Sequence, residues 1–406
     1  MGNSLKIVEK GAANGSIQES IATPKPLQAG RPTIEGLYVH IPFCFHKCHY
    51  CDFYSITAGH NDPDRLKAFT DRLIAEIRLR ATQCDLRPTT VFVGGGTPSL
   101  LPADQWRRLG RVLNELGNLD QATERTIEAN PETVTEDRIA AWCEAGINRV
   151  SIGAQSFDPR RLKLLERHHD PAAVDRAVDL VRAGGIDNIN LDLIFAIPGQ
   201  TADDVADDLD RALALNPDHL SVYGLTFEPD TALTTRRDLG RIQEVDESRQ
   251  RRMYQRVISR LADAGYEHYE ISNWARPGRR CAHNLLYWHN RAWLGVGPSA
   301  ASHVASWRWR NRPHLGQWMI SDPEPPTEDH EHLPPDQRLG EQLMLGLRVR
   351  EGIDLNRLDP PLDEDNPRRQ TVDQFQVQGL LTMDEGHLRL TDRGLMVADS
   401  VLSELL

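Results

Sequence analysis

Cysteine is scarce in this chain, and long apolar runs are missing. Only 6 of the 406 residues are cysteine, and no segment approaches the roughly 18 consecutive apolar residues of a membrane-spanning helix. The N-terminal region lacks the apolar core of a secretory signal, and Lys6 stands where an N-myristoylation signal requires serine or threonine. We therefore expect a cytoplasmic protein without a transmembrane segment. These absences do not exclude peripheral contact with a membrane.

An excess of positive charge is also missing. The formal net charge is -12, which gives no general attraction to nucleic acid phosphates. Local basic clusters such as residues 236–241 (RRDLGR) are interpreted as solvated faces, so we expect no nucleic acid partner. Hydrophobic residues make up 39% of the chain and charged residues 26%, which is ordinary for a soluble globular protein. The length allows one large domain and a smaller one.

Short apolar runs alternate with amphipathic segments along much of the chain. The runs are typical of buried strands and begin at Gly36, Thr89, Arg125, Arg149, Asn188 and His219. Between them lie helical patterns, one of which places Leu66, Phe69, Leu73 and Ile77 on one face. Six strand–helix units predict an α/β fold with a parallel sheet. An incomplete (β/α)6 barrel suits six units best, and an open doubly wound sheet is the alternative.

Composition divides the chain into four parts. Residues 1–32 are rich in small residues and proline, which predicts a disordered tail. We assign residues 33–250 to the partial barrel and residues 251–320 to an extension. A proline-rich acidic segment begins at Ser321 and is interpreted as a linker. We assign residues 321–406, which include this linker, to a smaller C-terminal domain. After the linker, its pattern of helix, hairpin and helix resembles a winged helix.

Unusual residues follow successive strands of the predicted sheet. Three cysteines follow the first strand, residues 94–98 (GGGTP) follow the second and residues 128–131 (EANP) follow the third. Gln155 stands near the end of the fourth strand. Because α/β proteins bind ligands at the carboxyl ends of their strands, we expect these residues to converge on one rim.

Half of the cysteines stand together as Cys44, Cys48 and Cys51, with the spacing Cys-x3-Cys-x2-Cys. Thiolates select iron–sulfur clusters, zinc or copper. A [4Fe–4S] cluster is usually held by four cysteines, so three would leave one iron open, much as catalytic zinc sites keep an open position. A zinc site completed by His46 or His49 is the alternative, and a disulfide is a poorer one in the cytoplasm.

This spacing, with Tyr50 before the last cysteine, resembles the signature of the radical S-adenosylmethionine (SAM) superfamily. The GGGTP segment on the next strand fits the same resemblance, because glycines let the backbone approach a cofactor closely. The resemblance implies that the amino and carboxylate groups of SAM bind the open iron. It also implies an electron donor, since the reduced cluster of this superfamily cleaves SAM to a 5′-deoxyadenosyl radical.

Further motifs resemble the oxygen-independent coproporphyrinogen III oxidase group over about residues 36–230. They include YVHIPFC, IEANPE, SIGAQSFD and NLDLIFAIPGQT. The resemblance implies that SAM is bound by Tyr38, Tyr50, Gly95, Gly96, Thr97, Glu128, Gln155, Arg167 and Asp192. Carboxylates accept hydrogen bonds from amino and hydroxyl groups, and arginine pairs with carboxylates, so these residue types suit SAM. The alternative for each is an ordinary polar residue of a barrel mouth.

Two features resemble the HemW-type haem chaperones rather than the oxidases. The oxidases have a further cysteine two places after the third, where this chain has Phe53. Residues 283–288 (HNLLYW) match the HNxxYW motif of the chaperone branch. The resemblance implies that haem is bound by His283, Asn284, Tyr287 and Trp288, since an imidazole can ligate iron and aromatic rings can cover a macrocycle. A histidine hydrogen-bonded within the core remains the alternative.

The sequence therefore predicts a haem chaperone that carries a [4Fe–4S] cluster and SAM and delivers haem to apoproteins. Two other functions remain open: radical decarboxylation of coproporphyrinogen III, and a regulatory role in which a metal only stabilises the fold. Phe53 and the HNLLYW segment favour the chaperone. Oxidase activity is not expected, and no catalytic residue is assigned.

Overall fold

The computed structural model describes residues 24–28, 30–57, 62–115 and 124–406. Most of the predicted tail, including residues 1–23, lies outside the described residues. Its described end contains the short helix α1 (Lys25–Gln28), in which Leu27 is buried in one apolar cluster with Ile34 and Trp309. Pro26 is buried as well, and the ammonium of Lys25 lies 5.1 Å from the ring centroid of Trp307. This end of the segment therefore packs against the large domain, which composition alone does not indicate.

Six parallel strands form the centre of a large sheet and confirm the predicted α/β fold. They are β1 (Thr33–Ile41), β2 (Asp85–Gly95), β3 (Glu124–Ala129), β4 (Arg149–Gln155), β5 (Asn188–Phe195) and β6 (His219–Gly224). Each strand pairs with the next one in chain order, as an incomplete barrel of strand–helix units requires. The carboxyl ends of these strands therefore meet along one rim.

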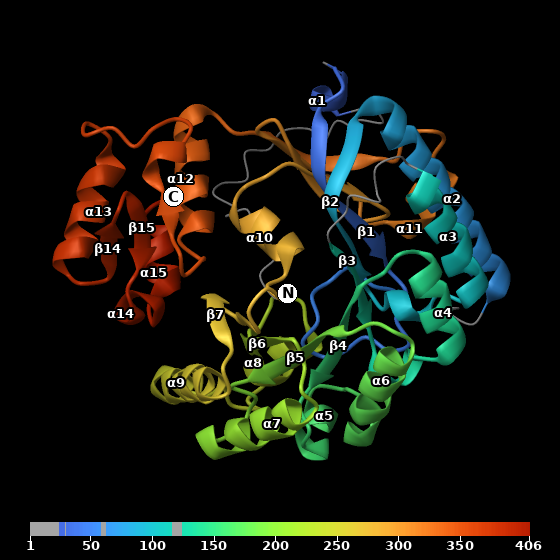
Figure 1. Ribbon diagram of the computed structural model, residues 1–406, viewed down its shortest axis with the longest axis horizontal. Coiled ribbons are helices and arrows are strands. Elements are labelled where there is room, and N and C mark those ends of the chain that lie inside the picture. The colour runs from blue at the N-terminus through green and yellow to red at the C-terminus, as the bar shows by residue number, and fades with distance from the viewer. Residues whose placement is uncertain (1–23, 29, 58–61, 116–123) are drawn as a thin grey trace.

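Helices connect these strands and cover the outside of the sheet (Figure 1). They are α2 (Pro63–Gln83), α3 (Ala103–Glu115), α4 (Glu136–Glu144), α5 (Pro159–Leu164), α6 (Pro171–Ala183), α7 (Ala202–Ala214), α8 (Ala232–Asp238) and α9 (Glu247–Asp263), with 3-10 turns η1 (Pro98–Leu100) and η3 (Pro131–Thr133). Among the described helices, none combines the length and apolarity that crossing a membrane demands.

Helix α2 shows how the sequence sets one of these elements. The side chain of Asp62 accepts hydrogen bonds from the backbone amides of Asp64 and Arg65, which satisfies two free donors of the first turn. The predicted apolar face is confirmed, because its four residues are all buried in the main core: Leu66, Phe69, Leu73 and Ile77. The cap thus fixes where α2 begins, and the apolar stripe fixes which side of the helix faces the sheet.

The edges of the large sheet are built from later strands. Strands β7 (Glu267–Glu270) and β8 (Asn273–Ala275) extend it beyond β6, and β9 (Trp293–Val296), β10 (Ala301–Val304), β11 (Trp307–Asn311) and β12 (Thr327–His332) extend it beyond β1. Two helices belong to this part of the chain, α10 (Ala282–Trp288) and α11 (Leu315–Ile320).

Strand β12 lies inside the segment that the sequence presented as a linker. The structure corrects that interpretation, because β12 pairs with β11 and carries the large sheet to His332. The reason is charge complementarity: Glu328 lies 2.8 Å from the guanidinium of Arg310, and Glu331 lies 3.8 Å from that of Arg308. Acidic residues that looked like a solvated linker thus form cross-strand ion pairs.

The C-terminal domain is smaller and forms a separate layer beside the barrel (Figure 1). It contains α12 (Pro335–Gly346), β13 (Ile353–Asp354), η4 (Leu355–Arg357), α13 (Pro367–Val377), β14 (Leu381–Asp384), β15 (His387–Leu390), α14 (Asp392–Leu395) and α15 (Ala398–Ser403). Its three strands form an antiparallel sheet, and its helices bury a core of their own. The domain joins the barrel through an antiparallel bridge between Glu270 and Val349.

A buried carboxylate links α2 to the edge of the sheet. Glu76 has no exposed surface and accepts three hydrogen bonds. The donors are the backbone amide of Gly297 at 3.1 Å, the side-chain amide of Asn311 at 2.7 Å and the indole of Trp318 at 2.8 Å. One side chain therefore holds three segments that are distant in the sequence.

Glu76→Ala should lower the free energy of unfolding by about 3 kcal/mol, because it leaves buried donors without an acceptor. Urea unfolding of the cluster-free protein measures the change. Glu115→Ala is the control, since that glutamate is exposed on α3 and its loss should cost less than about 0.5 kcal/mol. Equal losses in the two variants would contradict the anchoring role of Glu76.

Candidate cluster and cofactor site

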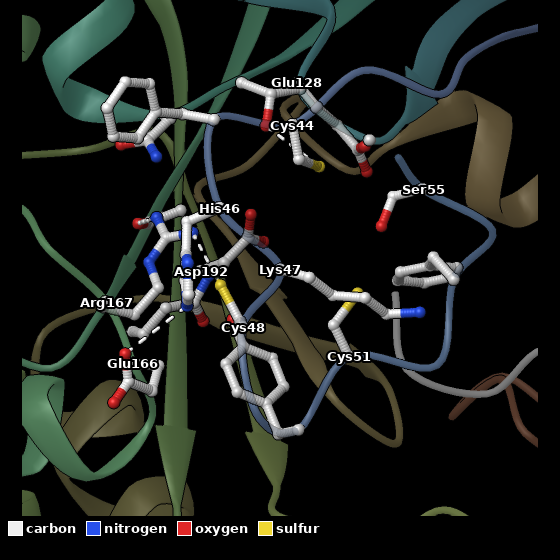
Figure 2. A pocket seen from close by; sticks show the side chains of 18 of the residues that line it. Cys44, His46, Lys47, Cys48, Cys51, Ser55, Glu128, Glu166, Arg167 and Asp192 are labelled. Carbon is white, nitrogen blue, oxygen red and sulfur yellow. Dashed lines mark hydrogen bonds and ion pairs between the residues drawn. The ribbon is translucent and has the colours of Figure 1, made fainter. Parts of the chain in front are cut away.

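A cavity of about 460 Å³ opens at the carboxyl ends of the parallel strands. All three clustered cysteines line it: Cys44, Cys48 and Cys51 (Figure 2). Its volume lies in the range of sites for small molecules and cofactors. The predicted convergence of strand ends on one rim is therefore seen directly in the structure.

The cysteine loop, residues 42–56, is fixed by backbone hydrogen bonds rather than by the cysteines. The amide of Cys44 donates to the carbonyl of Ile56 at 3.0 Å, and the amide of Ile56 donates to Pro42 at 2.8 Å. Farther along, the amide of His49 donates to Leu165 at 3.2 Å. The loop is therefore held at both ends and in its middle.

The surroundings of the three thiols favour their deprotonation when a metal cation binds. Burial raises the pKa of Cys44 and raises that of Cys51 to about 12, so both are thiols at neutral pH without a cation. The hydroxyl of Thr97 points at the Cys44 sulfur from 3.5 Å, and the guanidinium of Arg167 lies 3.7 Å from the Cys48 sulfur. Both donors favour a thiolate. Three soft ligands with such neighbours fit an iron–sulfur cluster or zinc.

The glycines of the GGGTP segment are needed for packing as well as for cofactor approach. Gly95 has a φ of +109°, and a Cβ there would lie 2.5 Å from the ring of His40. A Cβ on Gly96 would lie 2.7 Å from the backbone of Pro42. These positions accept only glycine, because a side chain would push β2 away from the cysteine loop.

Two carboxylates face the cavity from strands β3 and β5, which lie on either side of β4. Glu128 accepts a hydrogen bond from the amide of Gly95 at 3.0 Å. Burial, and then repulsion from Asp192, raise the pKa of Glu128 to about 7. Asp192 is held by the hydroxyl of Ser151 at 2.9 Å and the side-chain amide of Asn190 at 2.8 Å. A cationic ligand group between Glu128 and Asp192, such as an amino group, would relieve the repulsion between the two carboxylates.

Arg167 and Gln155 also line the cavity, and Figure 2 shows Arg167 near Cys48 and apart from Glu128. Arg167 donates to the carbonyl of Gly153 at 2.6 Å, which fixes the guanidinium beside Cys48. Gln155 has a φ of +64° at an irregularity in the pairing of β4 with β5. Such an irregularity re-aims a side chain at the end of a strand.

Of the nine residues assigned to SAM by resemblance, eight line this cavity: Tyr50, Gly95, Gly96, Thr97, Glu128, Gln155, Arg167 and Asp192. The ninth, Tyr38, lies behind this lining, and its hydroxyl is 3.0 Å from the Nδ1 atom of His40. The other nitrogen of His40 lies 3.0 Å from the carbonyl of Tyr54 and must donate to it. Tyr38 therefore supports the loop through His40.

Sequence reasoning missed several residues of the lining. Ser151 and Gly153 precede Gln155 on β4 at alternate positions, and Tyr223 occupies the end of β6. The signal that could have found them is the period of two along a strand, since alternate residues share a face. His40, which supports the cysteine loop from behind the lining, was also missed, because its ring packs against Gly95 of the neighbouring strand β2.

His46 and His49, the two candidates for a fourth zinc ligand beside the three cysteines, both lie beside Glu166. The Nε2 atom of His46 lies 3.4 Å from a carboxylate oxygen of Glu166, and that of His49 lies 3.9 Å from the other oxygen. The structure thus directs both imidazoles to Glu166.

Four residues of the HNLLYW motif were assigned to haem, and they do not line this cavity: His283, Asn284, Tyr287 and Trp288. His283 is fully buried on α10. Its Nδ1 atom lies 2.8 Å from the hydroxyl of Thr90, and its Nε2 atom lies 2.8 Å from the hydroxyl of Tyr287. Burial lowers the pKa of His283 to about 3, so the ring is neutral. In this conformation both ring nitrogens are occupied, as the alternative interpretation of the motif expected.

The rest of the motif packs around α10. The carboxylate of Glu124 accepts hydrogen bonds from the amides of Ala282 at 2.9 Å and His283 at 3.1 Å, which fixes the start of the helix. Asn284 is buried, and the guanidinium of Arg348 lies over the ring of Trp288 at 4.7 Å. Trp288 therefore faces the C-terminal domain, while His283 faces the interior of the barrel.

Comparisons with known proteins agree with this architecture. The family model of the Radical SAM superfamily matches residues 38–212, and that of the HemN C-terminal domain matches residues 333–397. A heme chaperone HemW of Mycobacterium tuberculosis is 37% identical over 378 residues, covering 91% of this chain and 94% of that protein. The heme chaperone HemW of Bacillus subtilis is 32% identical over 92% of this chain and 99% of its own length.

Among solved structures, the coproporphyrinogen III oxidase HemN of Escherichia coli, a radical SAM enzyme, superposes with a TM-score of 0.80. The superposition covers 93% of this chain and 92% of that one, at 25% sequence identity. The large partial barrel and the C-terminal domain therefore both have counterparts in that structure.

Glu128 should make the stability of the cluster-free protein depend on pH. Its folded pKa of about 7 exceeds the ordinary value of 4.5, so the folded state holds the extra proton between these values, and stability falls as pH rises through that range. Glu128→Gln keeps an acceptor for Gly95 and removes the charge. Urea unfolding should show a gain over wild type of about 3 kcal/mol near pH 8 and almost none near pH 4. A gain of equal size at both pH values would contradict the assignment.

Proposed function

Because this chain belongs to the HemW family of haem chaperones within the radical SAM superfamily, we propose that it binds haem and delivers it to apoproteins. We further propose that it carries a [4Fe–4S] cluster with SAM and works in the cytoplasm. The observation that carries the proposal is similarity to chaperones over nearly the whole chain, C-terminal domain included. The cysteine-lined cavity supports the cofactor part of the proposal.

The cluster would be held by Cys44, Cys48 and Cys51. When bound, such a cluster would supply one iron without a protein ligand, as a point of attachment for SAM. The chain's own residues would then orient SAM around that point. Glu128 and Asp192 would accept hydrogen bonds from its amino and ribose groups, since both line the cavity and a carboxylate oxygen can accept more than one hydrogen bond.

Other residues of the lining would hold the remaining parts of SAM. The backbone of residues 95–97 lies along the cavity without large side chains. Arg167 places a positive charge beside Cys48, where it would stabilise thiolate charge and pair with a carboxylate. An electron donor is a further expected partner, because the cluster must be reduced before it acts on SAM.

Haem binding by the HNLLYW motif requires α10 to move. His283 is neutral, which is the form that ligates iron, but Thr90 and Tyr287 occupy its ring nitrogens. We propose that haem-bound protein exchanges one of these hydrogen bonds for the iron. Helix α10 has only seven residues, so a small displacement would expose the ring.

Coproporphyrinogen oxidation is the second candidate function, and the solved structure of HemN favours it at the level of fold. Phe53 argues against it. This residue lines the same cavity as the three cysteines, at the position where the oxidases carry a further cysteine. The cavity here therefore has an aromatic ring in place of that thiol. A purely structural metal remains the third possibility.

Anaerobically reconstituted protein should contain about four irons and four sulfides per chain. Replacing Cys44, Cys48 or Cys51 by alanine should abolish the cluster, because each supplies one ligand. Cys143→Ala is the control, since that cysteine is exposed on α4. Iron and sulfide analysis together with electron paramagnetic resonance measures the result. Stoichiometric zinc without sulfide would contradict the cluster.

The chaperone proposal predicts that cluster-loaded protein binds haem, passes it to an added apo-haemoprotein and forms no protoporphyrinogen from coproporphyrinogen III. His283→Ala should weaken haem binding at least tenfold or change the visible spectrum, while iron and sulfide stay unchanged. Tyr287→Phe is the matched variant: it keeps the aromatic ring and frees the Nε2 atom of His283, so haem should bind at least as tightly as in wild type.

Each readout has a result that would contradict the proposal. Product formation from coproporphyrinogen III over many turnovers would establish the oxidase instead. If His283→Ala binds haem as tightly as wild type and with the same spectrum, the HNLLYW motif is not the haem site. Absence of haem binding by the cluster-loaded wild type would leave the structural metal as the better function.

A further inference from the structure

A second group of ligating side chains lies at the mouth of the cysteine-lined cavity. It consists of His46 from the cysteine loop, and Glu166 and His168 from the segment between α5 and α6. One ligand atom from each lies within 4.8 Å of the other two. Figure 2 shows His46 and Glu166 on the same side of the cavity, apart from Cys51.

The distances suit a small divalent cation. A carboxylate oxygen of Glu166 lies 3.4 Å from the Nε2 atom of His46 and 3.6 Å from that of His168. Ligands at about 2.0 to 2.1 Å from a tetrahedral metal are separated from one another by about 3.4 Å. The imidazole rings are perpendicular, with centroids 4.5 Å apart, so both nitrogens can approach one point without a clash of the rings.

The backbone holds this group in place without a metal. Glu166 has a φ of +55°, a left-handed conformation that few residues other than glycine adopt readily. The amide of Arg167 donates to the carbonyl of Leu162 at 2.8 Å, and the amide of His49 donates to Leu165 at 3.2 Å. The cysteine loop and the segment after α5 are therefore already in contact.

The side chains remain accessible to an ion from solvent. The exposed fractions are 40% for His46, 32% for Glu166 and 54% for His168. Two imidazoles and one carboxylate form a donor set that takes zinc or another first-row divalent metal rather than magnesium, which prefers oxygen ligands. With three protein ligands, a fourth position would be left for water.

We propose that His46, Glu166 and His168 form a second metal site, which takes zinc or a similar divalent cation and joins the cysteine loop to the segment after α5. The site is independent of haem binding and uses none of the three cysteines. Because His46 stands between Cys44 and Cys48 in the sequence, a metal there braces the part of the loop that carries these two thiols.

Zinc binding to cluster-loaded protein under anaerobic conditions tests the proposal. Isothermal titration with Zn²⁺ should show one site per chain in addition to the cluster. Zinc-edge X-ray absorption should show nitrogen and oxygen ligands at about 2.0 Å and no sulfur shell at about 2.3 Å. This readout separates the proposed site from zinc in an empty cysteine site, so it does not depend on the haem chaperone function.

Three variants and one control locate the metal. His46→Ala, Glu166→Gln and His168→Ala should each weaken zinc binding at least tenfold while iron and sulfide stay unchanged. His387→Ala should bind zinc as wild type does, since that histidine is exposed in the C-terminal domain. A sulfur shell, no zinc binding by the cluster-loaded protein, or equal affinity in all four variants would overturn the proposal and leave His46, Glu166 and His168 as surface ion pairs.

Discussion

The close approach of the cysteine loop to the end of strand β2 is the contact on which the site depends. The amide of Gly96 donates to the carbonyl of Ile41 at 2.8 Å, and the amide of Thr97 donates to that of Phe43 at 2.7 Å. These two bonds fix the first cysteine against the glycine segment. They form only because Gly95 and Gly96 lack a Cβ, which would meet His40 and Pro42. The cavity, the cysteines and the carboxylates are all positioned relative to this contact.

Much of this arrangement could be predicted from the sequence, for a physical reason. Parallel strands bring their carboxyl ends to one edge, so residues that follow separate strands must meet. This is why Cys44, Glu128 and Gln155 were expected together and line one cavity. A period of two along the predicted strands would also have assigned Ser151 and Tyr223 to the face that lines the cavity, because alternate residues of a strand share a face.

What could not be predicted depends on partners that are distant in the sequence. The acidic strand β12 looked like a linker, because the arginines that pair with it lie on β11. The residue types of the HNLLYW motif alone favour a packed core, and only the family resemblance favours a haem site. Glu124 and Thr90 decide that His283 is buried in this conformation, and neither could be linked to the motif before the strands were paired.

The packing of α10 between the barrel and the C-terminal domain has a thermodynamic consequence. Trp288 lies under Arg348, and the side-chain amide of Asn290, just after the helix, donates to Glu341 of α12 at 3.2 Å. Any displacement of α10 must therefore change the free energy of the contact between the two domains. Linkage is reciprocal. Under the haem binding proposed above, a protein that binds the C-terminal domain would shift the affinity of the motif for haem, and haem would shift the affinity for that protein by the same factor.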